Sequence, residues 1–406
     1  MTQSLRGLTT DAWLLLATRF FRLFAYGSLS VVLVFYLVGA GLSEREIGTL
    51  FTMTLAGDVA ISLFLTTRAD RIGRRRVLIA GALLMAAAGL TFASTRMRWL
   101  LLLAGTIGVI SPGGNEVGPF LPIEQAALSH VVSPETRTEV FAWYTLVGAT
   151  ATALGALAGG LAISFRAVII LYAAFGLVLA ILFSQLSPAA EVTAPAERKS
   201  VRGPLENLSG LDRSGRIVAR LSALFALDAF GGGFVVQSFA AYWFYLRFGV
   251  RPETLGAIFF CANLLAGLSA LVASRLASRF GLLPTMVATH LPSNVLLILV
   301  PLMPTLPLAV LVLLVRFSIS QMDVPTRQSY LMAVVAPDER SAAAGITGVA
   351  RTIGAAVSPV LVGFLFANPA LINVPFVAAG VLKIVYDILL YRTFSPVRLP
   401  EDAPLH

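Results

Sequence analysis

Long apolar runs alternate with short polar connectors from residue 11 to residue 392. An α-helix needs about 20 predominantly apolar residues to cross the hydrocarbon core of a bilayer, and most of the runs reach that length. We predict twelve spans, at residues 11–38, 47–67, 77–94, 99–123, 139–163, 167–187, 217–246, 254–274, 284–303, 307–330, 341–366 and 373–392. The pattern therefore predicts an all-α membrane protein with about twelve transmembrane helices.

One longer polar stretch interrupts the pattern near the middle of the chain. Residues 188–216 contain several Pro, Ser and Gly residues and charges of both signs. This composition is typical of a linker. We therefore predict an N-terminal six-helix bundle at 1–187, a cytoplasmic linker at 188–216 and a C-terminal six-helix bundle at 217–406.

The two halves carry related sequences at their helix ends. The run from Pro122 to Arg137 matches the run from Pro325 to Arg340 at a constant offset of 203 residues, with seven identical positions and one Glu replaced by Asp. The short run at 70–73 matches residues 278–281 in the same way, at an offset of 208. These matches predict two halves that share one fold and one orientation in the membrane.

The positions of the charges predict the orientation. The chain is 57% hydrophobic and only 13% charged, whereas a soluble domain carries about 25% charged residues. Its net charge of +9 comes from arginines that gather in the connectors of one face, so nucleic acid is not an expected partner. The connector at 66–78 alone holds Arg68, Arg71, Arg74, Arg75 and Arg76. Arginine-rich connectors stay on the cytoplasmic side, so both termini are expected there.

The same connector has a more specific pattern. Asp70, Arg71, Gly73 and Arg74 predict an ion-pair latch at a helix end, with the glycine allowing a sharp turn. An incidental Asp–Arg pair in a positively charged loop is the alternative. This run resembles the loop 2–3 signature of the major facilitator superfamily, except that Thr66 stands where the signature opens with Gly. The resemblance implies the major facilitator fold, with two six-helix halves related by a parallel repeat and substrate held between them.

Ionisable residues within the apolar spans are candidate functional groups, because charge at membrane depth is costly. Asp228 precedes a run of three glycines at 231–233, which weakens the helix. Arg19 and Arg22 lie three positions apart, on one face of the first helix. We expect Asp228 to pair with Arg19 or Arg22 in one conformation. Snorkelling arginines and a structural hydrogen bond of Asp228 are the alternatives.

Two more carboxylates lie in the first half. Asp58 is at the centre of the second span, where it either carries a proton or makes a packing contact. The run from Ser111 to Glu116 contains Pro112 and two glycines, so it should break the fourth helix and form a cavity wall. We expect Asn115 and Glu116 to point to substrate or proton.

The tenth span supplies further charges in the second half. Arg316 could neutralise Asp323 at a distance of two helical turns. Glu124 and Arg327 occupy equivalent positions of the repeat, so they form either a gating pair between the halves or two solvated helix ends. The sequence identifies no partner for Arg351. Lys383 and Asp387 lie four residues apart and should neutralise each other.

The candidate residues fall into three groups. They are Asp228, Asp58, Glu116 and Asp323 for proton coupling; Arg19, Arg22, Asn115, Arg316 and Arg351 for substrate binding; and Asp70, Arg71, Gly73, Arg74, Glu124 and Arg327 for gating. No metal site is expected, because His130, His290 and His406 are far apart. The lone Cys261 excludes an internal disulfide. No phosphate-binding loop and no nucleophile–base arrangement is recognisable, so neither an enzyme nor a cofactor is expected.

The fifth span carries Gly148, Gly155, Ala156, Gly159 and Gly160. This pattern resembles the antiporter motif of drug-exporting facilitators, although Ala156 stands where Pro is usual and the fourth span lacks the usual arginine. The resemblance implies a monomeric proton-coupled exporter of a small organic or amphipathic compound in the lipid bilayer of a bacterial inner membrane. The alternatives are a proton-coupled importer of a small organic anion and a non-transporting receptor or scaffold. Small residues at this spacing also allow close helix packing in any membrane bundle.

Overall fold

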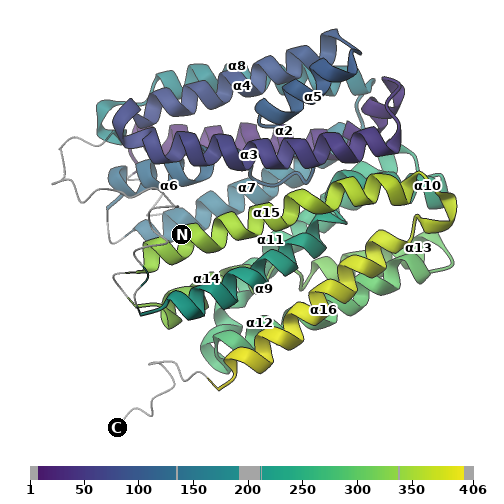
Figure 1. Ribbon diagram of the computed structural model, residues 1–406. Coiled ribbons are helices and arrows are strands. Elements are labelled where there is room, and N and C mark those ends of the chain that lie inside the picture. The colour runs from purple at the N-terminus through teal and green to yellow at the C-terminus, as the bar shows by residue number, and fades with distance from the viewer. Residues whose placement is uncertain (1–7, 134–135, 192–210, 212, 337–338, 397–406) are drawn as a thin grey trace. The chain divides into compact units, whose positions relative to one another are not determined.

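The computed structural model describes residues 8–133, 136–191, 211, 213–336 and 339–396 (Figure 1). The α-helices in these residues are α2 (Thr10–Gly39), α3 (Glu44–Ile72), α4 (Arg74–Ser94), α5 (Arg98–Ile107), α6 (Phe120–Val131), α7 (Arg137–Gly160), α8 (Phe165–Ser184), α9 (Gly215–Gly233), α10 (Gln237–Phe248), α11 (Pro252–Phe280), α12 (Leu282–Leu299), α13 (Leu306–Phe317), α14 (Asp323–Val334), α15 (Arg340–Phe366) and α16 (Val374–Phe394). Three short 3-10 turns, η1 (Pro188–Ala190), η3 (Val300–Leu302) and η4 (Pro369–Leu371), lie between them.

The predicted all-α membrane architecture is confirmed. Ten stretches in the described residues are long and apolar enough to cross a membrane, and two shorter apolar helices, α5 and α13, accompany them. Three predicted spans are broken helices: residues 108–119 separate α5 from α6, residues 234–236 separate α9 from α10, and residues 318–322 separate α13 from α14. The first two breaks lie where the sequence places the Pro-Gly run and the triple glycine.

The repeat in the sequence is also a repeat in the structure. Both ends of α14 lie 203 residues after the corresponding ends of α6, which is the offset of the sequence match. Gly73, between α3 and α4, has φ of +103°, and Gly281, between α11 and α12, has φ of +86°. Residues with a side chain rarely adopt such angles, so the prediction of a glycine for the sharp turn holds at both places.

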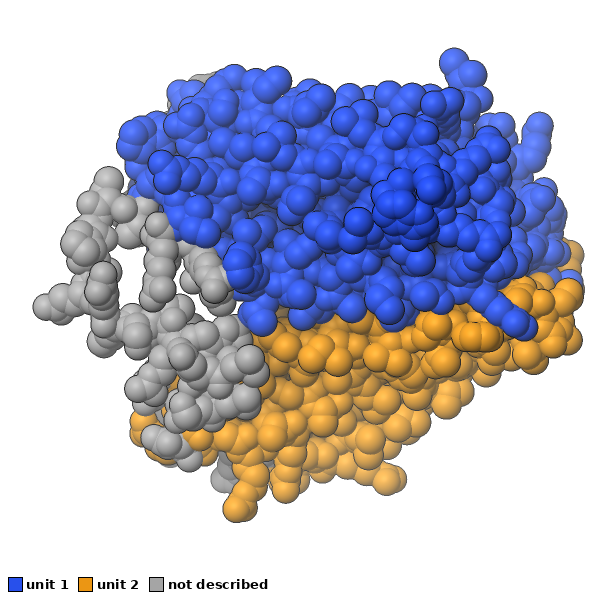
Figure 2. Space-filling view, turned by 45° about the horizontal axis from the view of Figure 1, so that its top comes forward, with its two compact units in different colours: residues 1–201, 236–264 blue, residues 202–235, 265–406 orange. Residues whose placement is uncertain are grey.

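The chain forms two compact units, shown in blue and orange in Figure 2. Unit 1 contains residues 1–201 and 236–264, and unit 2 contains residues 202–235 and 265–406. Thus α10 and the start of α11 pack with unit 1, although the sequence assigns them to the second half. Hydrogen bonds explain this: Gln237 donates from Nε2 to Ser30 Oγ at 2.8 Å, and the Ser238 N–H donates to Pro112 O at 3.1 Å.

Within unit 1, α2 and α7 approach until their backbones touch. A Cβ atom added at Gly27 would overlap Thr152 O, and one added at Gly155 or Gly159 would overlap the carbonyl oxygen of Phe24 or Ser28. Small residues permit such close contact between membrane helices. This packing accounts for Gly155 and Gly159 of the fifth span, whereas Gly160 lies against Gly256 of α11.

Unit 2 has its own apolar core, which involves α9, α12, α14 and α16. Val218, Leu221, Phe225, Met286 and Tyr386 are all nearly or completely buried in it. α12 packs along α16, and α9 packs along both α15 and α16. These contacts bring together the polar residues of four different helices in the middle of the unit.

The contact between α2 and α7 predicts a difference between two glycine substitutions. Gly159→Ala should lower the free energy of unfolding by about 1–3 kcal/mol, because the new methyl group overlaps Ser28. Gly345→Ala on α15 is the matched control, since nothing described lies within 4 Å of the added Cβ and alanine favours the helix. Thermal unfolding in detergent measures both. Equal midpoints for the two variants would contradict the packing argument.

Candidate functional site

A buried ion pair links α2 to α6 in unit 1. Arg22 and Glu124 are each 0% exposed. Two parallel bonds join them: Arg22 Nη1 donates to Glu124 Oε1 at 2.5 Å and Nη2 donates to Oε2 at 2.8 Å. This bidentate arrangement uses the planar guanidinium fully and fixes the rotation of both side chains. Arg22 therefore does not snorkel to an interface.

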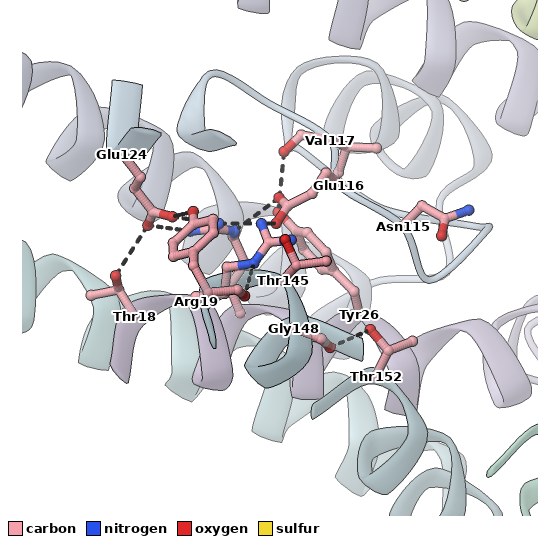
Figure 3. Close-up of polar contacts among 12 residues, drawn as sticks. Thr18, Arg19, Tyr26, Asn115, Glu116, Val117, Glu124, Thr145, Gly148 and Thr152 are labelled. Atoms are coloured by element: carbon pink, nitrogen blue, oxygen red, sulfur yellow. Dashed lines mark hydrogen bonds and ion pairs between the residues drawn. The ribbon is translucent and has the colours of Figure 1, made fainter. Parts of the chain in front are cut away.

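Further groups complete this cluster, as Figure 3 shows. Glu116 accepts from Arg22 Nε at 3.2 Å, and it also forms an ion pair with Arg19. Glu124 accepts additional hydrogen bonds from the hydroxyl groups of Thr18 and Tyr144. The Arg19 guanidinium lies 4.2 Å from the centre of the Tyr144 ring. Two arginines thus face two glutamates, and the formal charges of the four groups balance.

The non-helical segment at 108–119 places Glu116 in this cluster. Val109, Gly114 and Gly118 have positive φ values of 55°, 69° and 80°. Such backbone at membrane depth must be satisfied by protein groups. The Tyr172 hydroxyl donates to Val109 O at 2.6 Å, and the Gly118 N–H donates to Asp58 Oδ1. The break therefore has a function: it turns the chain so that a carboxylate points at α2.

Asp58 differs from the other carboxylates of unit 1. Its side chain accepts from Gly118 N and, at 3.2 Å, from Ser62 Oγ, one turn further along α3. No basic side chain of the described residues lies within 4 Å of it. Asp58 is thus a partly buried carboxylate that is hydrogen-bonded and has no counter-ion in the described part of the chain.

Unit 2 contains a second buried cluster, centred on Asp228 of α9. Lys383 Nζ lies 2.5 Å from Asp228 Oδ1, and Arg327 Nη1 lies 2.8 Å from Asp228 Oδ2. Asp228 is 4% exposed, so both of these bonds are shielded from solvent. The two cations come from α16 and α14. One carboxylate therefore holds three helices together.

His290 of α12 lies between two carboxylates in this cluster. Its Nδ1 is 2.7 Å from Asp387 Oδ1, and its Nε2 is 3.7 Å from Asp228 Oδ1. Asn294 donates to Asp387 Oδ2 at 3.0 Å, and Asp387 is 0% exposed. The short contact with Asp387 needs one proton between the two groups. Sequence reasoning missed His290, although the rule for ionisable residues in apolar spans applied to it as well.

Three more charges border this cluster. Arg327 lies 3.3 Å from Asp323, which begins α14. Arg316 and Arg351 both interact electrostatically with Asp323, and both are partly buried. The Nε atom of each is buried without a hydrogen-bond partner among the described residues. These two arginines therefore have donor groups left over.

The two clusters occupy equivalent places of the repeat, with the signs of charge exchanged. Glu124 of α6 corresponds to Arg327 of α14, 203 residues later, and each pairs with a residue of the first helix of its half. That residue is Arg22 on α2 and Asp228 on α9, 206 residues apart. In unit 1 the first helix supplies the cation and α6 supplies the anion. In unit 2 the first helix supplies the anion and α14 supplies the cation.

Several expected pairings need correction. Asp228 pairs with Arg327 and Lys383, whereas Arg19 and Arg22 pair with the two glutamates of their own unit. Glu124 and Arg327 are buried by these partners, so they do not form the solvated helix ends considered above. Lys383 and Asp387 do not neutralise each other. They point to different partners, because Asp228 and His290 lie on two different neighbouring helices.

The remaining predicted residues lie elsewhere. Asn115 is exposed and apart from the ion pairs in Figure 3, so it does not join the cluster. The backbone N–H groups of Arg74 and Arg75, at the start of α4, donate to Glu191 at 2.8 and 3.0 Å. Gly73 makes the preceding turn. The side chains of Asp70 and Arg71 fall outside the described part of the chain, so the latch stays a prediction.

Known proteins resemble this chain in sequence and in fold. The Major Facilitator Superfamily model matches residues 15–246 and, again, residues 221–405. The Uncharacterized membrane protein YJR124C of Saccharomyces cerevisiae is 31% identical over 425 residues, which cover 95% of this chain and 94% of the yeast protein.

Solved structures of two transporters have the same fold. A mutant of the nucleoside transporter NupG superposes with a TM-score of 0.76 at 14% identity, covering 95% of this chain and all of NupG. The human organic anion transporter MFSD10 (TETRAN) superposes with a TM-score of 0.64 at 16% identity, covering 94% of this chain and 98% of its own. Identities this low show the fold alone.

The buried pair in unit 1 predicts a non-additive pair of substitutions. Arg22→Met and Glu124→Leu should each lower the free energy of unfolding by about 3–5 kcal/mol, because each leaves an uncompensated charge in the bundle. The double variant should cost less than the sum, since it leaves neither charge behind. Denaturation by sodium dodecyl sulfate and by heat measures this. Additive losses would show that the pair does not act as a unit.

Proposed function

We propose that this chain, which belongs to the Major Facilitator Superfamily, transports a small organic anion in a process coupled to protons. Members of this fold are secondary transporters that expose a central site to the two sides of the membrane in turn. The two solved structures described above belong to transporters, which supports transport rather than catalysis. The fold itself does not select the substrate, because both a nucleoside transporter and an organic anion transporter have it.

Among the described residues at and beside the Asp228 cluster, basic side chains outnumber carboxylates, which supports an anionic substrate. Four basic side chains, Arg316, Arg327, Arg351 and Lys383, surround or border the cluster, against the three carboxylates of Asp228, Asp323 and Asp387. An uncompensated cation inside a membrane protein is costly, so a bound anion would be favourable there. In unit 1 the two buried arginines already have two glutamates.

Arg316 and Arg351 are the proposed substrate-binding groups. Each has a buried Nε atom with no partner in the described residues, and neither lies within 4 Å of a carboxylate there. A guanidinium binds a carboxylate or phosphate through two parallel hydrogen bonds, which fixes the orientation of the ligand. Arg19 and Arg22 are not proposed to bind the substrate, because each already forms an ion pair with a glutamate of unit 1.

Asp58 and the pair of His290 with Asp387 are the proposed proton sites. Protonation of Asp58 removes a charge that has no counter-ion among the described residues. His290 and Asp387 already share a proton, and His290 also faces Asp228. The carboxylates of Glu116, Asp228 and Asp323 are proposed to act as counter-ions instead, because each faces a basic group.

The glycines of α7 are accounted for by helix packing, with Gly155 and Gly159 against α2 and Gly160 against α11, so they do not favour export. The arginine-rich connectors support cytoplasmic termini, and the bacterial inner membrane remains the expected location. The sign of a substrate-driven pH change in vesicles would distinguish import with protons from exchange against them.

The proposed anion site predicts a selective loss of affinity. In proteoliposomes, Arg316→Gln and Arg351→Gln should each raise the KM for a transported organic anion by about 10- to 100-fold, which corresponds to losing a charged hydrogen bond. Uptake of labelled mono- and dicarboxylates and of neutral analogues measures this. Arg392→Gln, on an exposed position of α16, is the matched control. An unchanged KM in both cluster variants would overturn the anion assignment.

If the proposed proton sites are right, their substitution should abolish transport driven by a pH gradient and leave the exchange of substrate across the membrane intact. Asp58→Asn and Asp387→Asn should each abolish pH-driven substrate movement while keeping substrate counterflow, because counterflow needs no net proton transfer. The exposed Glu253→Gln is the control. Both assays use the same reconstituted vesicles, with an internal pH dye. Full pH-driven transport in both Asn variants would refute these proton sites, and no pH-driven transport in the unaltered protein would refute the coupling itself.

A further inference from the structure

A pocket opens at one end of unit 1, between the last turns of α2 and α4 and the first turn of α8. Its volume is about 400 Å³, and its lining includes Phe35, Tyr36, Arg96, Phe165 and Arg166. It lies at the end of α4 that is opposite the arginine-rich connector. The charge clusters described above contribute nothing to it. It is therefore separate from the proposed transport site.

The charge of the pocket is positive. Arg96 and Arg166 are both exposed, and the described residues that line the pocket include no carboxylate. Both arginines line the pocket together with Tyr36. Arg166 Nε donates to Ala93 O at 3.1 Å near the end of α4, and this is its one hydrogen bond among the described residues. Its two Nη nitrogens remain available for a ligand.

The position of the pocket is that of a membrane boundary. Three helices begin or end there, and aromatic rings gather beside it. The Phe35 ring lies 5.8 Å from that of Phe165 and 5.3 Å from that of Tyr245. Aromatic residues concentrate at the level of the lipid headgroups. A ligand in this pocket would sit at the same depth as those headgroups.

An apolar surface continues from the pocket into the membrane. Leu90, one turn before Ser94 on α4, is 53% exposed, and Ile170, one turn after Arg166 on α8, is 48% exposed. α4 and α8 pack along each other, as Figure 1 shows. Residues four apart lie on one helix face, so Leu90 and Ile170 lie below the pocket. An acyl chain attached to a headgroup in the pocket would follow this surface.

We propose that this pocket binds the phosphate headgroup of an anionic phospholipid. The two arginines would hold the phosphodiester oxygens, for which guanidinium groups are well suited. The aromatic rings would contact the glycerol part, and the acyl chains would lie along α4 and α8. A zwitterionic lipid binds less well, because its own cation is repelled by the two arginines.

A neighbouring pocket at the same end of unit 1 provides the contrast. It is lined by Arg45, Glu46 and Arg98 among others. There Glu46 forms an ion pair with Arg98 at 2.7 Å. That carboxylate takes the place that a lipid phosphate would need. Substitution of Arg98 therefore removes one positive charge from the same end of unit 1 and leaves the residues of the proposed lipid site unchanged.

Lipid binding to the purified full chain tests the proposal. Native mass spectrometry would compare phosphatidylglycerol with phosphatidylcholine in the unaltered protein and in two double variants. The first is Arg96→Ala with Arg166→Ala. The charge-matched control is Arg98→Ala with Arg251→Ala, where Arg251 is an exposed residue directly before α11 and outside the pocket lining. We expect a preference of at least about 10-fold for phosphatidylglycerol that is lost in the first double variant and kept in the second. Equal losses in both, or no preference in the unaltered protein, would overturn the proposal.

A single-residue variant and a soluble competitor complete the lipid-binding test. Arg96→Ala alone should lower the preference for phosphatidylglycerol, and it removes no hydrogen bond to α4, so a folding defect of the Arg166 variant does not decide the outcome. Glycerol 3-phosphate serves as a soluble competitor. Weak competition is expected for a lipid site that also uses the acyl chains, whereas competition as strong as that of the lipid would identify a site for soluble phosphates and overturn the lipid assignment.

Discussion

The structure depends on one constraint: a charge inside a membrane bundle must find its counter-ion within the protein. Arg22 and Glu124 satisfy it in unit 1, and Asp228 and Arg327 satisfy it in unit 2. Both pairs join the first helix of a half to the helix that follows a break. The exchange of signs between the halves shows that the contact matters more than the identity of the charged residue. Each half can therefore keep its geometry while its electrostatic field differs.

The broken helices follow from the same constraint. A continuous helix would leave Glu116 on a fixed face, whereas the segment at 108–119 turns it toward α2. The turn exposes backbone groups, which Tyr172 and Asp58 then satisfy. α2 packs closely on α7 through Gly155 and Gly159, and Gly148 of α7 lies against the Arg19 side chain. Helix packing, backbone irregularity and buried charge thus form one arrangement.

The sequence predicted the spans, the repeat and the break near 111–116, and a weakened helix at the triple glycine, because these depend on local composition and on self-similarity. It did not predict the break at 318–322. It did not predict the ion-pair partners. Arg22 and Glu124 are 102 residues apart, and several arginines and carboxylates could have met. Lys383 illustrates the limit: the i,i+4 rule favoured Asp387, but the neighbouring helix offered Asp228 at 2.5 Å. The sequence also did not predict that α10 packs with unit 1, because this packing depends on hydrogen bonds to Ser30 and Pro112, which are distant in sequence.

The two clusters differ in how their charges are paired, and this difference suggests that the two halves respond differently to a bound ion. In unit 1, Arg19 and Arg22 are matched by Glu116 and Glu124, so these four groups offer no excess positive charge to a bound anion. In unit 2, Asp228 is shared by two cations and faces His290, so its partners compete for one carboxylate. A charge that enters such a shared network changes the balance among several helices at once. A bound anion or a moving proton would therefore have its largest structural effect on α9, α12, α14 and α16.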